Sequence, residues 1–244
     1  MSPKYFWPGL FLALIFSPCV AQDTCSVPKD EVITFDQEMA WSGSWDSLLR
    51  ASGATELGEA LIGRSFDIQK LEDYIGKDSL GKDSLVIRLY CGTATTPQEG
   101  FAYVPDLILV KGGPCNEDKT SALLATATGT STVTIDKASG YIKTYAGHMK
   151  QVDLPGNISY EIAARTFSMR TVVDFIERDE YAQLSFYFML RPNGSKPKDG
   201  PQPLLFDMCM MGFETYSTQT VYVNFAQPCP RLCDFESLLY QSTQ

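Results

Sequence analysis

The chain has 244 residues, 44% of them hydrophobic and 20% charged, so it can bury a core and has room for at most two small domains. Its formal net charge is −9, and an acidic chain is a poor candidate for nucleic-acid binding, because phosphate groups are bound by basic surfaces. His148 is the single histidine, which argues against a histidine-rich metal site and narrows the options for a serine-type catalytic triad.

Residues 1–21 are predicted to be a secretory signal peptide. Lys4 supplies a small positive charge, residues 6–16 are apolar, and small residues lead to a cleavage position after Ala21. The apolar run is about half the length that a membrane span needs, and no later stretch is long enough to cross a bilayer. The sequence therefore predicts a secreted, extracellular protein in which residues 22–244 form one domain.

Six cysteines remain once the predicted signal peptide is removed. An even number in a secreted chain predicts three disulfides, and the sequence does not choose among the fifteen connectivities. No metal is expected, because no Cys-x-x-Cys pair with a matching second half is present. The cysteines predicted to form disulfides are Cys25, Cys91, Cys115, Cys209, Cys229 and Cys233.

Two N-glycosylation sequons agree with an extracellular location. They are Asn157-Ile158-Ser159 and Asn193-Gly194-Ser195, and both lie in turn-like surroundings. Asn157 and Asn193 are therefore predicted glycosylation sites.

In chain order, the predicted elements are one short helix or helical turn, a long series of strands and a final short helix. The first is at 44–52, and the last is at 234–240 with Asp234 as its N-cap. Apolar and polar residues alternate with a period of two, which is typical of half-buried strands. This pattern occurs at 85–90, 182–190, 204–210 and 220–225, and further candidate strands cover 59–69, 100–111, 122–135, 139–147, 157–168 and 171–177. Many strands without long helices predict an all-β barrel or sandwich.

The segment that follows the signal peptide carries the most informative motif. Cys25-Ser26-Val27-Pro28 and Phe35-Asp36 precede Gly43-Ser44-Trp45, and Arg50 follows. This arrangement resembles the opening of the lipocalin family. The resemblance implies an antiparallel up-and-down β-barrel with one short C-terminal helix. In such a barrel Gly43 would let the chain turn into the first strand, and Trp45 would plug the closed end.

A second and partial resemblance to lipocalins lies near the end of the chain. Glu214-Thr215-Tyr216 stands where the family usually has Thr-Asp-Tyr. The family's late arginine, which packs over the tryptophan, has Arg231 as its only candidate here, and the expected strand before it is missing.

The resemblance implies that the protein carries a small hydrophobic ligand, such as a lipid, retinoid or pigment, inside the barrel. No cofactor is expected, and the oligomeric state is left open. Methionine and aromatic side chains can line an adaptable apolar pocket, although any single one of them can equally be core. The predicted pocket residues are Trp45, Phe186, Phe188, Phe206, Met208 and Tyr222.

Two other classes of function stay open at this point. One is an extracellular matrix or secretion component without a small ligand. The other is a cofactor-free enzyme that acts on a bound apolar molecule, although no Gly-x-Ser-x-Gly, His-Glu-x-x-His or phosphate-loop motif is present. A solvated turn is the favoured interpretation of the acidic cluster Asp174, Glu177, Asp179 and Glu180, and a surface position is favoured for His148.

Overall fold

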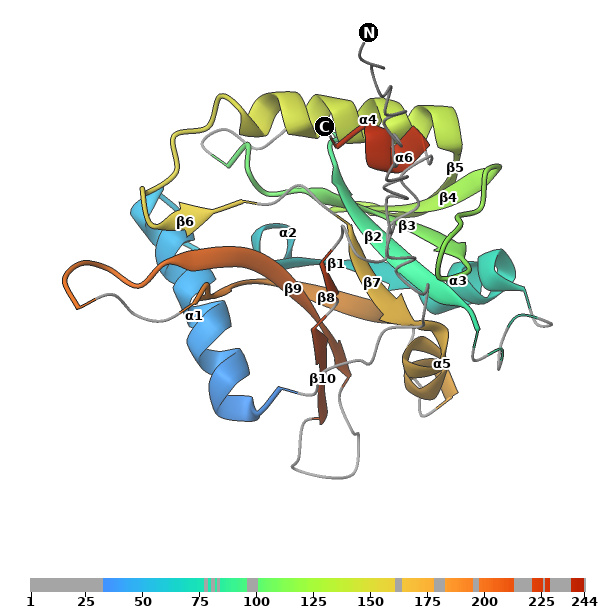
Figure 1. The fold of residues 1–244 in the computed structure, drawn as a ribbon, viewed down its shortest axis with the longest axis horizontal. Helices are drawn as coiled ribbons and strands as arrows, with labels where there is room; N and C mark the ends of the chain where they lie inside the picture. The colour runs from blue at the N-terminus through green and yellow to red at the C-terminus, as the bar shows by residue number, and fades with distance from the viewer. Residues whose placement is uncertain are drawn as a thin grey trace, which may run out of the picture.

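The computed structural model describes residues 33–76, 79, 82, 84–95, 101–160, 164–177, 183–194, 198–212, 221–225, 227–228 and 238–243. Within this part of the chain the strands form two sheets that do not close into a barrel, and helices pack against them (Figure 1). The prediction of an all-β barrel is therefore wrong, and the fold mixes helices with strands. The predicted signal peptide and Cys25, Cys229 and Cys233 lie outside the described residues.

The first sheet is built mainly from the C-terminal half of the chain. Its strands are β1 (Gly63–Asp67), β8 (Gln183–Pro192), β9 (Leu204–Gly212), β10 (Val221–Phe225) and β6 (Ile158–Ser159). The first four pair in that order, each antiparallel to its neighbour, and β6 pairs parallel with the start of β9. The strands predicted at 182–190, 204–210 and 220–225 are confirmed.

The second sheet is built mainly from the middle of the chain. Its strands, in spatial order, are β11 (Gln227–Pro228), β7 (Arg165–Ser168), β2 (Val86–Gly92), β3 (Asp106–Gly112), β4 (Ser121–Thr126) and β5 (Gly129–Thr134). All neighbours are antiparallel. The strand predicted at 85–90 is confirmed. The single strand predicted at 122–135 is instead a hairpin, which turns at Gly129 with a φ of 135° that favours glycine.

Several segments that were predicted as strands are helices. The described helices are α1 (Phe35–Ala51), α2 (Glu59–Ile62), α3 (Ile68–Ile75), α4 (Ile135–Met149), α5 (Met169–Glu177) and α6 (Leu238–Gln241). The strands predicted at 139–147 and 171–177 are therefore wrong. The helix predicted at 44–52 is only the second half of α1. That longer helix begins at a capping box, in which the side chains of Thr34 and Gln37 each accept from the other residue's backbone N–H.

Helix α4 forms because its apolar residues recur at helical spacing. Ile135, Ala138, Ile142, Tyr145 and Met149 are three or four positions apart, and all five are buried. The helix begins after Thr134, whose hydroxyl accepts from a backbone N–H of the first turn. Together with α6, it covers the outer face of the second sheet, as Figure 1 shows.

The main core fills the space between the two sheets. Alternate residues of each strand point inward, and Leu89 of β2, Leu109 of β3 and Phe186 of β8 are all fully buried there. Helix α1 packs against β8 and adds Trp45 to this core. The Gly43-Ser44-Trp45 motif therefore lies in the middle of a helix. The expectation that Gly43 turns the chain into a first strand is wrong.

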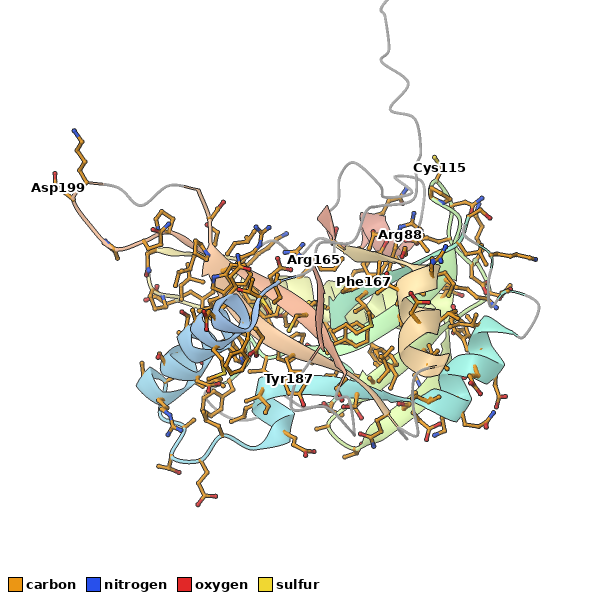
Figure 2. All side chains as sticks on the ribbon, turned by 90° about the horizontal axis from the view of Figure 1, so that it is seen from below. Arg88, Cys115, Arg165, Phe167, Tyr187 and Asp199 are labelled. Carbon is orange, nitrogen blue, oxygen red and sulfur yellow. The ribbon has the colours of Figure 1, made fainter. Side chains whose placement is uncertain are left out.

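Two ion pairs join one sheet to the other. Arg64 of β1 donates from Nε to Oδ1 of Asp106 in β3 at 3.2 Å, and Arg165 of β7 donates from Nε to Oδ1 of Asp207 in β9 at 2.8 Å. All four side chains are at least nine-tenths buried. Arg165 lies between the sheets in Figure 2, and its Nη2 also donates to the carbonyl of Phe206. These pairs fix the relative position of the sheets.

A third buried arginine organises the loop after β3. Arg88 donates to the carbonyl oxygens of Gly113, Pro114 and Asn116, so the loop that carries Cys115 folds back over the end of the second sheet (Figure 2). Its side chain is fully buried. This arginine has a structural role, because backbone carbonyls surround it.

Candidate functional site

A polar hollow of about 270 Å³ opens where the two sheets meet. Its walls come from α2, β1, the turn between β4 and β5, and β8. Side chains with hydrogen-bonding groups dominate the lining. They are Glu59, Arg64, Ser65, Thr126, Thr128, Gln183, Ser185 and Tyr187.

The register between β1 and β8 places three of these side chains on one face of the first sheet. Ser65 lies opposite Ser185, and Gly63 lies opposite Tyr187. Because side chains alternate along a strand, Ser185 and Tyr187 point away from the aromatic core that Phe186 enters. Gly63 is required at its position, since a Cβ there would lie 2.4 Å from the carbonyl oxygen of Phe186.

One threonine holds the β4–β5 hairpin beside β1. The Thr130 hydroxyl accepts from the Asp67 backbone N–H at 2.9 Å and donates to the Ser65 carbonyl at 3.3 Å. Lys70 adds a hydrogen bond from Nζ to the Thr130 carbonyl at 2.7 Å. At the seam between the sheets, a side chain therefore makes the hydrogen bonds that backbone groups make between paired strands. The hairpin turn at Thr126–Gly129 forms one wall of the hollow.

Two hydroxyl groups of the hollow are hydrogen-bonded to each other across β1 and β8. Ser65 and Ser185 share a hydrogen bond of 2.8 Å between their Oγ atoms, and the Tyr187 hydroxyl belongs to the same lining. Burial raises the pKa of Tyr187, and the charge of Glu59 raises it further. Tyr187 is therefore a neutral hydroxyl at physiological pH, available both as donor and as acceptor.

Arg64 borders the hollow, but its register opposite Phe186 directs its nearly buried guanidinium to the other face of β1, between the two sheets. Its Nη1 donates to the carbonyls of Ala60 at 2.6 Å and Gly63 at 2.7 Å, and its Nε donates to Asp106. No described residue accepts from Nη2. The guanidinium carbon lies 5.8 Å from the centre of the Phe188 ring, so the charged end of Arg64 lies against the aromatic core.

The predicted ligand-pocket residues are brought together by the fold, but as packed core. Trp45, Phe186, Phe188, Phe206 and Met208 are each at most 1% exposed. The ring centre of Trp45 lies 5.7 Å from that of Phe188 and 5.3 Å from that of Phe206, which is ordinary aromatic packing. Of these five residues, only Phe186 also lines the hollow. Tyr222 lies on β10, and its side chain is outside the described part of the structure.

Two of the predicted disulfide cysteines are free thiols. Cys91 on β2 and Cys209 on β9 are buried and unbridged, so the prediction that they form disulfides is wrong. Cys115 is disulfide-bonded. Burial raises the pKa of the Cys91 thiol to about 12 and raises that of Cys209 as well. Both are therefore protonated and inert at neutral pH.

Alkylation should report the burial of these two thiols. In the folded protein at pH 8 we expect iodoacetamide to leave Cys91 and Cys209 unmodified, because the thiolate is the reactive form and neither thiol meets solvent. In urea both should react within minutes. Peptide mass spectrometry measures the difference, and modification of the folded protein at the rate seen in urea would contradict the structure.

The predicted sequons differ in their surroundings. The Asn157 side chain is partly buried and donates from Nδ2 to the Gln202 carbonyl at 3.0 Å, whereas Asn193 is exposed at the end of β8. The connection from β8 to β9 then runs outward past Asp199 (Figure 2). Glycosylation at either position stays a prediction.

The residues weighed for an enzyme do not converge. His148 lies in the last turn of α4, and Asp174 lies in α5 on the opposite side of the molecule (Figure 1). Asp179 and Glu180 are outside the described residues. Within the described residues, no group of three or more histidine, cysteine, aspartate or glutamate side chains is arranged to hold a metal ion.

The sequence signals for the hollow were present but unspecific. Gln183, Ser185 and Tyr187 were recognised as the polar face of a strand, and such a face usually meets solvent. Arg64 and Glu59 fell within a predicted strand at 59–69 and carried no motif. A hollow that joins four separate parts of the chain has no local pattern in sequence.

Among the helices that the structure describes, none combines the length and the hydropathy that crossing a membrane needs. No protein-family model, curated protein or solved structure matches the chain, and the resemblance to lipocalins stays a prediction.

Proposed function

We propose that this is a secreted binding protein that holds a small polar molecule in the hollow at the seam of its two sheets. The observation that carries the proposal is the convergence there of hydrogen-bonding groups from distant parts of the chain. Ser65, Ser185 and Tyr187 supply hydroxyls from two strands, Thr126 and Thr128 supply hydroxyls from the hairpin turn, and Gln183 supplies an amide. Convergent polar groups in a concave site are the usual basis of ligand orientation and specificity.

The geometry favours a polar ligand over the apolar one that the sequence suggested. The aromatic side chains expected to line an apolar pocket pack against each other, whereas hydroxyl, amide and charged groups line the hollow. An apolar ligand would displace the water that hydrogen-bonds to these groups in the free protein. The groups would then have no hydrogen-bond partner, which makes binding less favourable in free energy. Carriage of a lipid, retinoid or pigment stays a prediction.

The volume of the hollow limits the size of the ligand. A volume of about 270 Å³ lies just below the usual range of drug-sized sites. A monosaccharide, a polyol, an amino acid or a small amine meets this limit. A lipid chain or a tetrapyrrole does not.

A titration followed by nuclear magnetic resonance tests the proposal. The probes are a panel of monosaccharides, polyols, amino acids and small amines, added to the ¹⁵N-labelled chain without its predicted signal peptide. At least one class should shift the backbone amides of Gly63, Gly129 and Ser185, which line the hollow. The same probe should leave the amides of α4 unchanged, because that helix covers the other sheet.

A blocking variant gives the control. Ala127 is an exposed residue at the hairpin turn that lines the hollow, and its replacement by tryptophan fills the space without removing a hydrogen-bonding side chain. We expect Ala127→Trp to weaken binding by about tenfold or more, which corresponds to about 1.4 kcal/mol. Ala40→Trp makes the same substitution at an exposed position of α1 outside the hollow, and it should bind as the wild type does. Absence of binding across the whole panel would refute the proposal.

A further inference from the structure

Asn193 and Gly194 form the one Asn-Gly pair in the sequence, since each of the other three asparagines precedes a larger residue. Asparagine is a thermolabile residue, because the backbone nitrogen of the next residue can attack its side-chain amide carbon. A side chain on that next residue hinders the attack, and glycine has none. The sequence therefore makes Asn193 the most reactive asparagine, provided that the folded chain leaves both reacting groups available.

The structure leaves both groups available. Asn193 is exposed after the end of β8, and its side-chain amide makes no hydrogen bond with any residue that the structure describes. The backbone N–H of Gly194, which supplies the attacking nitrogen, has no acceptor among the described residues either. Open space surrounds this glycine, because a Cβ added to it would meet nothing within 4 Å.

Neighbouring residues hold the two ends of this pair and not its centre. The Asn193 backbone N–H donates to the Pro203 carbonyl at 2.8 Å, and the Gly194 carbonyl accepts from Nε2 of Gln202 at 3.2 Å. These two hydrogen bonds keep the pair at the base of the connection from β8 to β9. Neither of them engages the Asn193 side chain or the Gly194 nitrogen.

Asn157 has the opposite arrangement. Its Nδ2 donates to the Gln202 carbonyl at 3.0 Å, and the N–H of the following residue, Ile158, donates to the Pro155 carbonyl at 2.8 Å. Both reacting groups would first have to give up a hydrogen bond, and the side chain of Ile158 is branched next to the backbone. The fold therefore protects Asn157 and leaves Asn193 unprotected.

We propose that Asn193 is a site of spontaneous covalent modification, at which the folded protein forms a succinimide and then aspartate and isoaspartate. The Gly194 nitrogen loses its proton to water or hydroxide and bonds to Cγ of Asn193. The bond between Cγ and Nδ2 then breaks, and the leaving nitrogen takes up a proton and departs as ammonia. Water adds to either carbonyl of the ring and opens it, so the reaction needs no oxidant or reductant.

The modification is compatible with the fold and has two consequences. The register of β8 and β9 ends at Pro192 and Leu204, so the extra main-chain atom of isoaspartate lies in the connection and not between paired strands. One consequence is a new negative charge at the surface. The other concerns the predicted sequon, because Nδ2 of Asn193 is the atom to which a sugar would be attached. A molecule that has deamidated at Asn193 can no longer be glycosylated there.

Peptide mass spectrometry of an aged sample tests the proposal. The chain without its predicted signal peptide is made in a host that adds no N-glycans, and it is kept at pH 8 and 37 °C, either folded or in guanidinium chloride. In the folded protein, the Asn193 peptide should become a mixture of aspartate and isoaspartate at a rate within about threefold of that in denaturant, because no hydrogen bond has to break first. Gly194→Ala should slow the conversion by about tenfold or more.

Ile158→Gly places a second Asn-Gly pair in the same molecule, where the structure protects it. In denaturant, Asn157 and Asn193 of this variant should convert at similar rates. In the folded variant, checked by circular dichroism, Asn157 should convert about tenfold more slowly than Asn193, because two hydrogen bonds must break first. If the variant does not fold, the wild-type comparison at Asn193 decides alone.

Three results would overturn the proposal. The first is an Asn193 peptide that stays unchanged in the folded protein while it converts in denaturant. The second is aspartate without isoaspartate, which would mean direct hydrolysis and no succinimide. The third is equal conversion of Asn157 and Asn193 in folded Ile158→Gly, which would mean that the hydrogen bonds seen in the structure do not select the site.

Discussion

Replacing Asp207 by alanine is expected to lower the free energy of unfolding by about 3–5 kcal/mol. Asp207 is fully buried, and its carboxylate accepts from Nε of Arg165 at 2.8 Å, from Nε of Arg191 at 2.6 Å and from the Met208 backbone N–H at 3.0 Å. Truncation leaves a buried guanidinium beside an empty space and also releases one of the two ion pairs that join the sheets. Both effects act in the same direction.

Urea denaturation with a fitted slope measures this loss, and two variants calibrate it. Asp174→Ala makes the same change at an exposed position of α5 and should alter stability by no more than about 0.5 kcal/mol. Arg191→Ala should cost less than Asp207→Ala, because the Arg191 side chain is 27% exposed and water can replace part of its interaction. A loss below about 1 kcal/mol in Asp207→Ala would mean that the sheets are not held together at this point.

Replacing Trp45 by alanine should lower the free energy of unfolding by a similar amount, about 3–5 kcal/mol. The indole is fully buried, and its ring centre lies 5.7 Å from that of Tyr103 and 5.3 Å from that of Phe206. Its Nε1 donates to the Leu61 carbonyl at 3.0 Å, which ties α1 to α2. The variant loses this hydrogen bond and leaves a cavity that the surrounding packed side chains fill only in part.

The same substitution at a neighbouring tryptophan is the control. Trp41 is only partly buried on the same helix and packs against a smaller cluster, so Trp41→Ala should cost clearly less than Trp45→Ala. Trp45 belongs to the core and not to the hollow. Molecules of the Trp45→Ala variant that remain folded should therefore bind a hollow ligand with unchanged Kd. Equal losses in the two variants would contradict the placement of Trp45 at the centre of the core.

The parts of the fold that the sequence predicted well are those with a strong local period. In β8 the apolar residues Leu184, Phe186 and Phe188 alternate with polar ones, and the strand follows that alternation. Strands β2, β9 and β10 were found in the same way. A period of two depends only on neighbouring residues, so it can be recognised in the local sequence without knowing how the rest of the chain folds.

Helices were wrongly predicted as strands where the residue types favour a strand but the spacing of the apolar residues favours a helix. Residues 139–147 contain isoleucine, threonine and two tyrosines, which favour strands, but Ile142, Tyr145 and Met149 have helical spacing. The segment forms a helix because that spacing lets these side chains be buried together against the second sheet. In α1, Gly43 and Trp45 suggested a turn into a strand. The stronger local signal was the capping box that begins at Thr34.

The disulfide prediction failed at Cys91 and Cys209 because an even count was taken as a sufficient argument. Cys91 follows Leu89 and Tyr90 in a strand whose residues are all buried, and Cys209 stands between Met208 and Met210. Such positions suit a small apolar side chain, and free cysteine is often used in this way.

The prediction of a closed barrel was wrong for a different reason. Closure depends on how β1 and β5 meet, and at that seam the Thr130 side chain replaces a backbone ladder.

The central claim is that the ligand is polar and lies in the hollow at the seam, not between the aromatic side chains of the core. The most direct test is to record amide spectra of one ¹⁵N-labelled sample with the panel of small polar probes and of another with oleate or retinol. The account predicts that at least one polar probe shifts Gly63, Gly129 and Ser185, and that neither apolar molecule shifts them or the core residues Phe188 and Phe206. Shifts at Phe188 and Phe206 with oleate or retinol, and none in the hollow with any polar probe, would contradict it.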